Sequence, residues 1–330
     1  MYDKRFSGHQ SFPLRKGWLH KYYKIVDKGV DDVSKLEVED LAVKWGVGKN
    51  MVDAIKYWAD AIGIGNPEKN KLSTGASEEM LSSWDIYWTL NQNDSYMVHR
   101  STLWLTHWLL CRDTSVITSY RYFFSFYSGL TVSKDSLYAA MEESFERRNL
   151  FPSLTKKNDS ISYLTLDAEA SMKKDINVFF QMYSSRKNTK KKDQEDCLLA
   201  MFTELELLKE LGGQKDTWVC ELDERVSLSD DVFSFCLLDY ITRNYTDTTS
   251  NTIPLNDLIY GEGSPGRVFR MSEKEIENRL EVMKKSKTFE GKLLFDNSRG
   301  SRSIIIKDQT LVELKAVRGL LDKVYKKHVK

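Results

Sequence analysis

Apolar residues recur at helical spacing through most of the chain, and alternating strand patterns are few and short. Two short helices are predicted between residues 38 and 62, separated by the break at Gly46 to Gly48. Their apolar positions are Leu41, Trp45, Met51, Ile55, Trp58 and Ile62. This spacing predicts a helix-turn-helix, and the turn-rich stretch after Ile62 predicts the short hairpin of a wing.

A second pattern with the same plan lies in the C-terminal region. Ser272 precedes an amphipathic helix, and Glu275 follows Ser272 at the spacing of a capping box. The stretch "KLLFDNSRGSRSIIIK", residues 292–307, alternates and turns like a hairpin. We therefore expect a second winged-helix pattern at this end of the chain.

The middle of the chain is rich in aromatic residues. "STLWLTHWLL" and "SYRYFFSFYSG" predict buried helices, and large rings suit contacts between helices. His99 and His107 lie eight residues apart, about 12 Å along one helix, so we expect structural roles rather than a shared metal ion. The predicted fold class is mainly α, with winged helix-turn-helix modules at both ends, an aromatic-rich helical middle and short β-hairpin wings.

Changes in composition divide the chain into four consecutive segments. Residues 1–78 form the expected N-terminal winged module together with the opening "FSGHQSFPLR", and residues 79–183 form the helical middle. Residues 184–195 are a basic linker or loop without apolar side chains, and residues 196–330 form the C-terminal helical and winged-helix domain. The basic linker favours solubility, with a flexible phosphate contact as the alternative.

Charge and cysteine content bound the cellular setting. The 49 Lys and Arg residues nearly balance 48 Asp and Glu residues, so any contact with nucleic acid depends on local basic patches. The four cysteines form no C-x-x-C pair, which favours reduced thiols in a cytoplasm. No apolar segment is long enough to predict a signal peptide or a membrane span, so we expect a soluble cytoplasmic protein.

Both winged modules would place basic side chains opposite their apolar stripes, where a DNA duplex could be gripped. Double-stranded DNA is thus the expected partner, although winged folds also serve protein contacts and such helices also simply pack on their neighbours. The oligomeric state is left open. The candidate DNA contacts are Lys16, Lys49, Asn50, Lys56, Arg267, Arg270, Lys284, Lys285, Arg299 and Arg302.

Motifs for nucleotide or acyl chemistry are missing from the sequence. It contains neither G-x-x-x-x-G-K-[ST] nor G-x-S-x-G, so no bound nucleotide is expected. In "CELDER", Glu221 and Asp223 would share one face of an extended segment and could bind Mg²⁺ or Mn²⁺. The alternative is an ordinary exposed acidic turn.

The opening strip, residues 6–21 or "FSGHQSFPLRKGWLHK", carries the other candidate chemistry. His9 offers a general base, Gln10 an amide and Arg15 a clamp for a phosphate, and together they form the candidate catalytic group. The strip is also rich in large apolar residues, so from its chemistry alone we favour a core plug in which His9 is only hydrogen-bonded.

Six ordered segments resemble one known family. They are "FSGHQSFPLRKGWLHK", "WGVGKNMVDAIKYWADAIGI", "STLWLTHWLL", "EDCLLAMFTELELL", "VFSFCLLDYI" and "SPGRVFRMSE", and they resemble in order the landmarks of the SspB-like family over about residues 6–305. The resemblance implies a DNA-nicking component of bacterial DNA phosphorothioate modification and phage defence, related to restriction-modification. It also implies a cysteine desulfurase, an ATPase and an ATP pyrophosphatase as partner proteins.

One position departs from the family pattern. The glycine-histidine pair is usually followed by a glutamate in the family, whereas this chain has Gln10. Glutamine can serve neither as an anionic metal ligand nor as a carboxylate base, so an acid required in relatives would have to come from elsewhere. Two alternatives to a nicking enzyme therefore stay open: a non-catalytic DNA-binding docking subunit of the same machinery, and a winged-helix transcription regulator.

Overall fold

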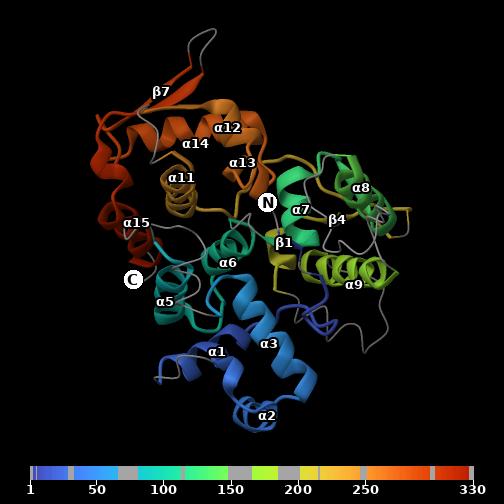
Figure 1. The fold of residues 1–330 in the computed structure, drawn as a ribbon. Helices are drawn as coiled ribbons and strands as arrows, with labels where there is room; N and C mark the ends of the chain where they lie inside the picture. The colour runs from blue at the N-terminus through green and yellow to red at the C-terminus, as the bar shows by residue number, and fades with distance from the viewer. Residues whose placement is uncertain are drawn as a thin grey trace, which may run out of the picture. The chain divides into compact units, whose positions relative to one another are not determined.

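The computed structural model describes residues 3–4, 6–28, 33–65, 81–112, 116–147, 166–184, 201–214, 216–245, 251–297 and 302–326, and these are mainly helical (Figure 1). The chain forms two compact units, and each unit combines two separate stretches of sequence. Unit 1 comprises Met1–Ala61 and Asp113–Glu221, and unit 2 comprises Ile62–Arg112 and Leu222–Lys330. The periodicity of the sequence suggested consecutive segments because it carries no information about contacts between distant stretches.

Three helices follow the opening strip in unit 1. They are α1 (Trp18–Val26), α2 (Val38–Trp45) and α3 (Lys49–Ala61), and α3 packs against both α1 and α2. Gly46 ends α2 in the left-handed region, with φ of 62°. The two helices and the break predicted from the apolar spacing are confirmed. The predicted wing runs from Ile62 through "NPEKN" and "KLST", and its residues 66–74 lie outside the described residues.

The second stretch of unit 1 is built around helices α7 (Ser119–Phe126), α8 (Lys134–Arg147) and α9 (Leu166–Tyr183), drawn in green shades in Figure 1. These helices pack on one another, and aromatic rings of α7 and α9 are in contact. The ring centroids of Phe123 and Phe179 lie 5.0 Å apart, and Trp218, which follows later in the chain, stacks on Phe180 at 4.1 Å. Short 3-10 helices are η1 (Val33–Lys35) and η2 (Thr203–Leu205).

Unit 1 also contains two small sheets. Strand β1 (Asp3–Lys4) pairs in parallel with β2 (Val116–Ile117). Strands β3 (Thr131–Ser133), β4 (Lys209–Glu210) and β5 (Thr217–Val219) form an antiparallel sheet in the order β3-β5-β4. The β1–β2 and β3–β5 pairs join stretches that are far apart in the sequence, whereas β4 and β5 are close neighbours along the chain.

Unit 2 is centred on α11 (Asp230–Tyr245), which packs against α6 (Arg100–Arg112) and α15 (Leu314–Lys326). Helix α5 (Ser83–Asp94) covers α6 and α15. Every residue of 101–112 is buried, so α6 is enclosed on all sides. The buried aromatic helix predicted from "STLWLTHWLL" is confirmed.

The C-terminal part of unit 2 places a helix beside a three-stranded antiparallel sheet. It comprises β6 (Thr252–Pro254), α12 (Leu255–Tyr260), α13 (Pro265–Val268), α14 (Glu273–Lys285), β7 (Leu293–Asp296), β8 (Ser303–Ile306) and η3 (Gln309–Val312). The strand order is β6-β8-β7, which confirms the hairpin predicted for 292–307.

One of the two hydrogen bonds of the capping box predicted for α14 is present. The Ser272 hydroxyl accepts a hydrogen bond from the Glu275 amide at 3.2 Å, as expected at an N-cap. The Glu275 carboxylate does not complete the capping box but accepts from Arg279 Nε at 2.6 Å. Arg279 in turn donates to the carbonyl oxygens of Leu228 and Arg225, so this glutamate orients an arginine that ties a loop to the helix.

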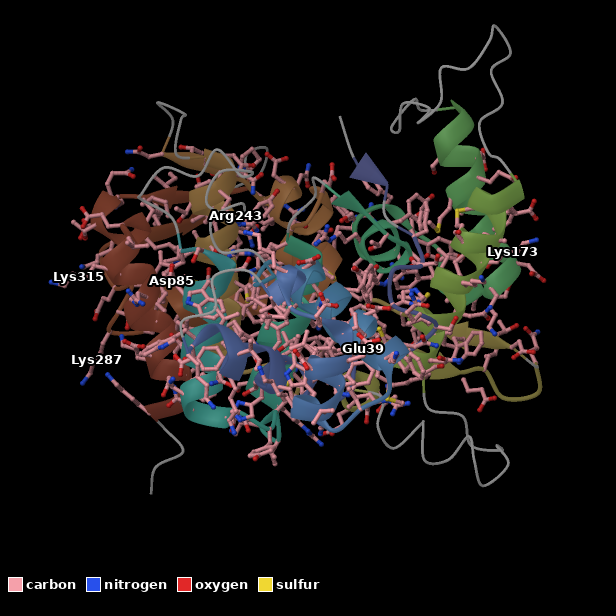
Figure 2. All side chains as sticks on the ribbon, turned by 60° about the horizontal axis from the view of Figure 1, so that its bottom comes forward. Glu39, Asp85, Lys173, Arg243, Lys287 and Lys315 are labelled. Atoms are coloured by element: carbon pink, nitrogen blue, oxygen red, sulfur yellow. The ribbon has the colours of Figure 1, made fainter. Side chains whose placement is uncertain are left out.

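Charged side chains mostly project outward from each unit, as Lys173 does from α9 and Lys287 from the turn after α14 (Figure 2). Within the described ranges, no helix combines the length and the apolar character needed to cross a membrane.

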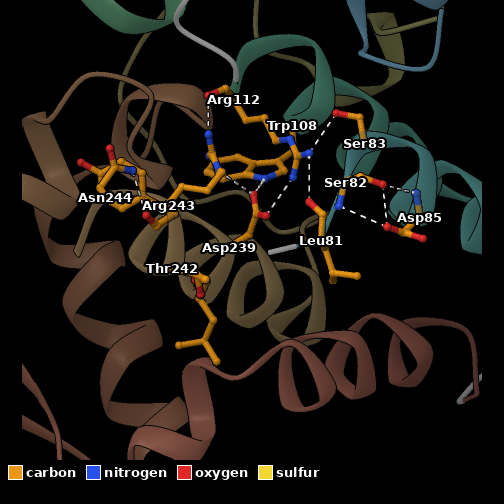
Figure 3. A network of polar contacts seen from close by, with 12 residues as sticks. Leu81, Ser82, Ser83, Asp85, Trp108, Arg112, Asp239, Thr242, Arg243 and Asn244 are labelled. Carbon is orange, nitrogen blue, oxygen red and sulfur yellow. Dashed lines mark hydrogen bonds and ion pairs between the residues drawn. The ribbon is translucent and has the colours of Figure 1, made fainter. Parts of the chain in front are cut away.

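The main exception inside unit 2 is a buried ionic network around Asp239 of α11 (Figure 3). Its carboxylate accepts from Trp108 Nε1 at 2.7 Å and from Arg112 at 2.8 Å, and Arg243 pairs with it at 3.3 Å. Burial alone raises the pKa of Asp239, but the two arginines and the Trp108 hydrogen bond together hold this pKa below its ordinary value. Arg112 also donates to the Ser83 hydroxyl at 2.9 Å and thereby ties α5 to the α6–α11 contact.

Candidate functional site

The opening strip folds into a tight, strained turn before α1. The amide of Phe12 donates to the carbonyl oxygen of His9 at 2.8 Å. Ser7, Gln10 and Ser11 have φ angles of 62°, 50° and 61°, a left-handed conformation that costs a non-glycine residue about 1 kcal/mol or more. At Gly8, a Cβ atom would lie 2.3 Å from Cδ2 of Tyr57, so only glycine fits there. Tight packing against α3 holds this unfavourable backbone in place.

His9 is buried, and both of its ring nitrogens are engaged. Nδ1 accepts a hydrogen bond from the Ser11 amide at 3.1 Å, so the neutral ring carries its proton on Nε2, which donates to Asp175 Oδ1 at 3.1 Å. The ring stacks on Trp58 with centroids 5.9 Å apart and meets Tyr57 edge-on at 5.4 Å. In this conformation His9 directs no lone pair toward solvent.

Asp175 joins three segments of unit 1. It lies on α9 and is 2 % exposed, and its second oxygen accepts from the Ser119 amide at 2.7 Å. Because Ser119 is the first residue of α7, the carboxylate also lies at the favourable positive end of that helix. The strip, α7 and α9 are thus tied together through one buried carboxylate. This arrangement is the one expected of a core plug.

Three other members of the strip lie nearer the surface. Gln10 and Ser11 are exposed, and Arg15 is half-buried. The Arg15 guanidinium carbon lies 5.6 Å from the Phe12 ring centroid and 5.4 Å from that of Trp18. Contact with two aromatic rings restricts the orientation of the guanidinium, and a planar guanidinium is the group best suited to bind a phosphate through two N–H bonds.

The expected DNA contacts of unit 1 differ in their surroundings. Lys16 pairs with Glu204 at 2.6 Å, and exposed Lys49 pairs with Glu39. Asn50 is exposed at the start of α3, whereas Lys56 is half-buried and donates to the Leu36 carbonyl oxygen at 3.4 Å. Of the two lysines on α3, Lys49 is thus paired with a carboxylate and Lys56 with a backbone oxygen.

In unit 2, the prediction for Arg270 is wrong. Arg270 was expected at a DNA surface, but it is only 1 % exposed and has φ of 51°, so its side chain belongs to the core. Arg302 pairs with Glu273 and Glu277 of α14, and half-buried Arg267 donates to the Tyr260 carbonyl oxygen at 3.4 Å. Arg299 lies outside the described residues. Lys284 and Lys285 remain on the surface at the end of α14.

Glu221 and Asp223 are both exposed. Asp223 Oδ1 accepts from the neighbouring Glu224 amide at 2.8 Å, and the Asp223 amide donates to the Arg270 carbonyl oxygen. Across the part of the chain that the structure describes, no three His, Cys, Asp or Glu side chains are grouped closely enough to hold a cation. Because two exposed acids provide too few ligands for a cage, this pair does not fit a resident divalent ion.

Comparison with known proteins gives a match along almost the whole chain. A family model described as a protein of unknown function, DUF4007, matches residues 6–325. The chain belongs to this family. Similar solved structures include a magnesium ion-bound SspB crystal structure, with 26 % identity and a TM-score of 0.71. The match covers 98 % of this chain and 89 % of the SspB chain. A second SspB crystal structure has 27 % identity and a TM-score of 0.70, and the match again covers 98 % of this chain and 89 % of the SspB chain. No curated protein matches the sequence.

These matches confirm that this DUF4007 chain is SspB-like, as its six ordered segments predicted. Two residues of possible functional importance were not predicted from the sequence. Asp175 interrupts an apolar stripe of α9 that includes Met172, Ile176 and Phe179, and an acid at a buried helical position could have revealed it. Lys307 follows β8, and nothing in its local pattern indicates that it lies beside Lys284 and Lys285.

Proposed function

We propose that this SspB-like chain is the DNA-binding, strand-nicking component of a bacterial DNA phosphorothioate modification and phage-defence system. The observation that carries the proposal is the likeness to SspB in both sequence and fold over 98 % of this chain. A cysteine desulfurase, an ATPase and an ATP pyrophosphatase are the partner proteins that this assignment implies, and the cytoplasm is the compartment it requires.

The order of elements in unit 2 supports binding to double-stranded DNA. Three helices, α12 to α14, follow strand β6, and the β7–β8 hairpin follows them, which is the plan of a winged helix. We propose that α14 and the hairpin form one DNA-gripping module and that α2 and α3 belong to a second. In this proposal Arg302 must exchange its carboxylate partners on α14 for a phosphate.

Backbone strain in the opening strip supports a functional role for that strip. Strained residues persist where the surrounding structure enforces them, and they are concentrated at functional sites. We propose that Gln10 and Arg15 contact the phosphate that is cut. For His9 to accept a proton, the strip has to release the Ser11 amide from Nδ1, so His9 acts as a base only after the strip has rearranged on DNA.

A non-catalytic docking subunit is the second candidate. The buried and fully bonded state of His9 favours it, because this state leaves the strip without an accessible base. In this case the chain delivers DNA to the sulfur-transfer enzymes, and the strip holds α7 and α9 in place.

A supercoiled-plasmid assay separates the two candidates. The purified protein is incubated with plasmid in Mg²⁺, Mn²⁺ or chelator, beside Gln10→Ala, Arg15→Ala and a control, Lys24→Ala, which removes one exposed charge from α1. A nicking enzyme produces open circles with the wild type and the control, and we expect Arg15→Ala to slow nicking by about a hundredfold or more.

DNA binding by the same proteins is measured in parallel by electrophoretic mobility shift. Intact plasmid with wild-type binding would reject the nicking proposal and assign the docking role. Nicking that survives both strip substitutions would move the cutting site elsewhere in the chain. If the wild type neither binds nor cuts DNA, both candidates fail.

A further inference from the structure

A basic hollow lies in unit 2 between the end of α14 and the β7–β8 hairpin. It encloses about 330 Å³ and is open to solvent. We call it the lysine hollow, and its lining residues are Lys284, Lys285, Glu290, Gly291, Leu293, Leu294 and Lys307.

Positive charge exceeds negative charge in the lysine hollow. Its lining contains three lysines and one carboxylate, that of Glu290. Lys284 is partly neutralised by Glu281, with Nζ 3.5 Å from Oε1. Among the described residues, no acidic side chain pairs with Lys285 or Lys307, and both are exposed. The ammonium groups of Lys285 and Lys307 thus lie without an acidic partner in the same hollow as the partly neutralised ammonium group of Lys284.

The convergence of these lysines is a product of the tertiary structure. Lys284 and Lys285 end α14, where positive charge favourably opposes the helix dipole without any ligand. Lys307 follows β8 and has no such reason to be there, and its amide donates to the Lys292 carbonyl oxygen at 2.8 Å. Pairing of the hairpin ends therefore brings Lys307 to the hollow, where an anion would be attracted by all three lysines.

The lining of the lysine hollow also includes apolar side chains and a glycine. Leu293 is buried, and Leu294 is half-buried on the opposite face of β7. Gly291 has φ of 75°, and no atom lies within 4 Å of where its Cβ would be. A phosphate with an attached sugar has this combination of a charged group and a carbon surface, whereas a small free anion would use only the lysines.

We infer that the lysine hollow binds a backbone phosphate of DNA, with the adjoining deoxyribose against Leu294. This inference rests on the proposed DNA-binding function, and it assigns a backbone phosphate as the group that the lysine hollow binds. Lysine binds a phosphate as a flexible point charge and reads no base, so the hollow contributes affinity and position rather than sequence preference.

The test compares two double variants with the same change in charge. Lys285→Ala/Lys307→Ala removes the unpaired charges of the hollow, whereas Lys287→Ala/Lys315→Ala removes two exposed lysines that do not line it and that are labelled in Figure 2. Affinity for a fluorescein-labelled duplex of arbitrary sequence is measured by anisotropy over a range of salt concentrations.

For the hollow variant we expect affinity at low salt to fall by roughly twentyfold or more. The magnitude of the slope of log affinity against log salt should fall by about two if each lysine neutralises its own phosphate, or by about one if they share one phosphate. The control variant should keep the wild-type slope. Removing the opposing carboxylate with Glu290→Gln should strengthen binding by about two- to fivefold.

The outcomes separate this inference from the proposed function. If the wild type binds DNA and the hollow variant keeps its slope and affinity, the inference fails while DNA binding stands. Acetylation of Lys285 and Lys307, followed by mass spectrometry, then distinguishes the ligand: protection by inorganic phosphate but not by duplex would identify a free-anion site and overturn the inference. A wild type that binds no duplex overturns both.

Discussion

His107 shows how a single buried side chain makes stability depend on pH. It lies inside α6, where Nε2 donates to the Val268 carbonyl oxygen at 2.9 Å and the Cys111 sulfur lies 3.8 Å from Nδ1. Burial lowers the pKa of His107 to about 4, and the nearby Arg225 acts in the same direction. The folded protein therefore holds this ring neutral at pH values where an unfolded chain would protonate it.

His107 should make unfolding easier as the pH falls. Below about 6.5 the unfolded chain binds a proton at His107 and the folded chain does not, so stability declines down to about pH 4 and then levels off. The loss in the free energy of unfolding totals about 3 kcal/mol for this pKa shift. His107→Gln can keep the bond to Val268 but cannot titrate. Urea unfolding at several pH values should show the free energy of unfolding of the wild type falling relative to that of the variant as the pH drops from 7 to 4. A difference between the two proteins that stays constant over this range would refute the assignment.

Other buried polar residues were hard to anticipate for the same reason. Arg270, Asp175 and Asp239 are all buried. The hydrogen-bond partners of Asp175 and Asp239 lie far away in the sequence. Local patterning assigns charged residues to the surface by default, which is why Arg270 was wrongly expected at the surface. Asp175 and Asp239 each interrupt an apolar pattern of their helix, which is a local signal of a buried acid.

At the scale of elements, helix ends follow local chemistry closely. The α2–α3 break, the Ser272 cap and the β7–β8 hairpin were all predicted correctly, because capping and turn geometry depend on a few neighbouring residues. The Glu275 side chain was predicted wrongly because Arg279, one turn further on, competes for its carboxylate. Local rules therefore locate an element better than they choose its side-chain partners.

Gly46 and Gly319 should respond in opposite ways to the same substitution. Gly46→Ala places a side chain at φ of 62° with no atom within 4 Å of its Cβ, so only the backbone is strained, and we expect a loss of about 1 kcal/mol. Gly319 lies inside α15, also without close neighbours, and Gly319→Ala should gain about 1 kcal/mol. Denaturant unfolding measures both, and equal shifts would show that the α2 end does not require glycine.

At the scale of the whole molecule, the interleaving of two units is the main feature. The chain leaves unit 1 after Ala61, completes part of unit 2, returns at Asp113 and enters unit 2 again at Leu222. Neither unit can therefore be formed by one continuous piece of chain. The net charge of +1 also means that DNA has to be held by local patches, of which the lysine hollow is the clearest in the described part of unit 2.

The interleaving predicts how fragments behave. Residues 222–330 expressed alone lack α5 and α6, so the face of α11 that carries Asp239 loses Trp108 and Arg112. We expect this fragment to bind a hydrophobic dye and to show no cooperative thermal transition. Joining residues 81–112 to it through a flexible linker should restore cooperative melting. A cooperative transition of the isolated fragment would show that α5 and α6 are dispensable.

The sequence by itself determined the mainly helical class, most helix positions, the C-terminal hairpin and the SspB-like family, because periodicity, capping and ordered motifs are local properties. Only the tertiary structure decided that His9 is bonded to Asp175, that Arg270 is buried, that Lys307 joins Lys284 and Lys285, and that the units interleave. Each of these depends on contacts between residues distant in sequence. Such contacts are chosen by the packing of whole helix faces, which no short stretch of sequence encodes.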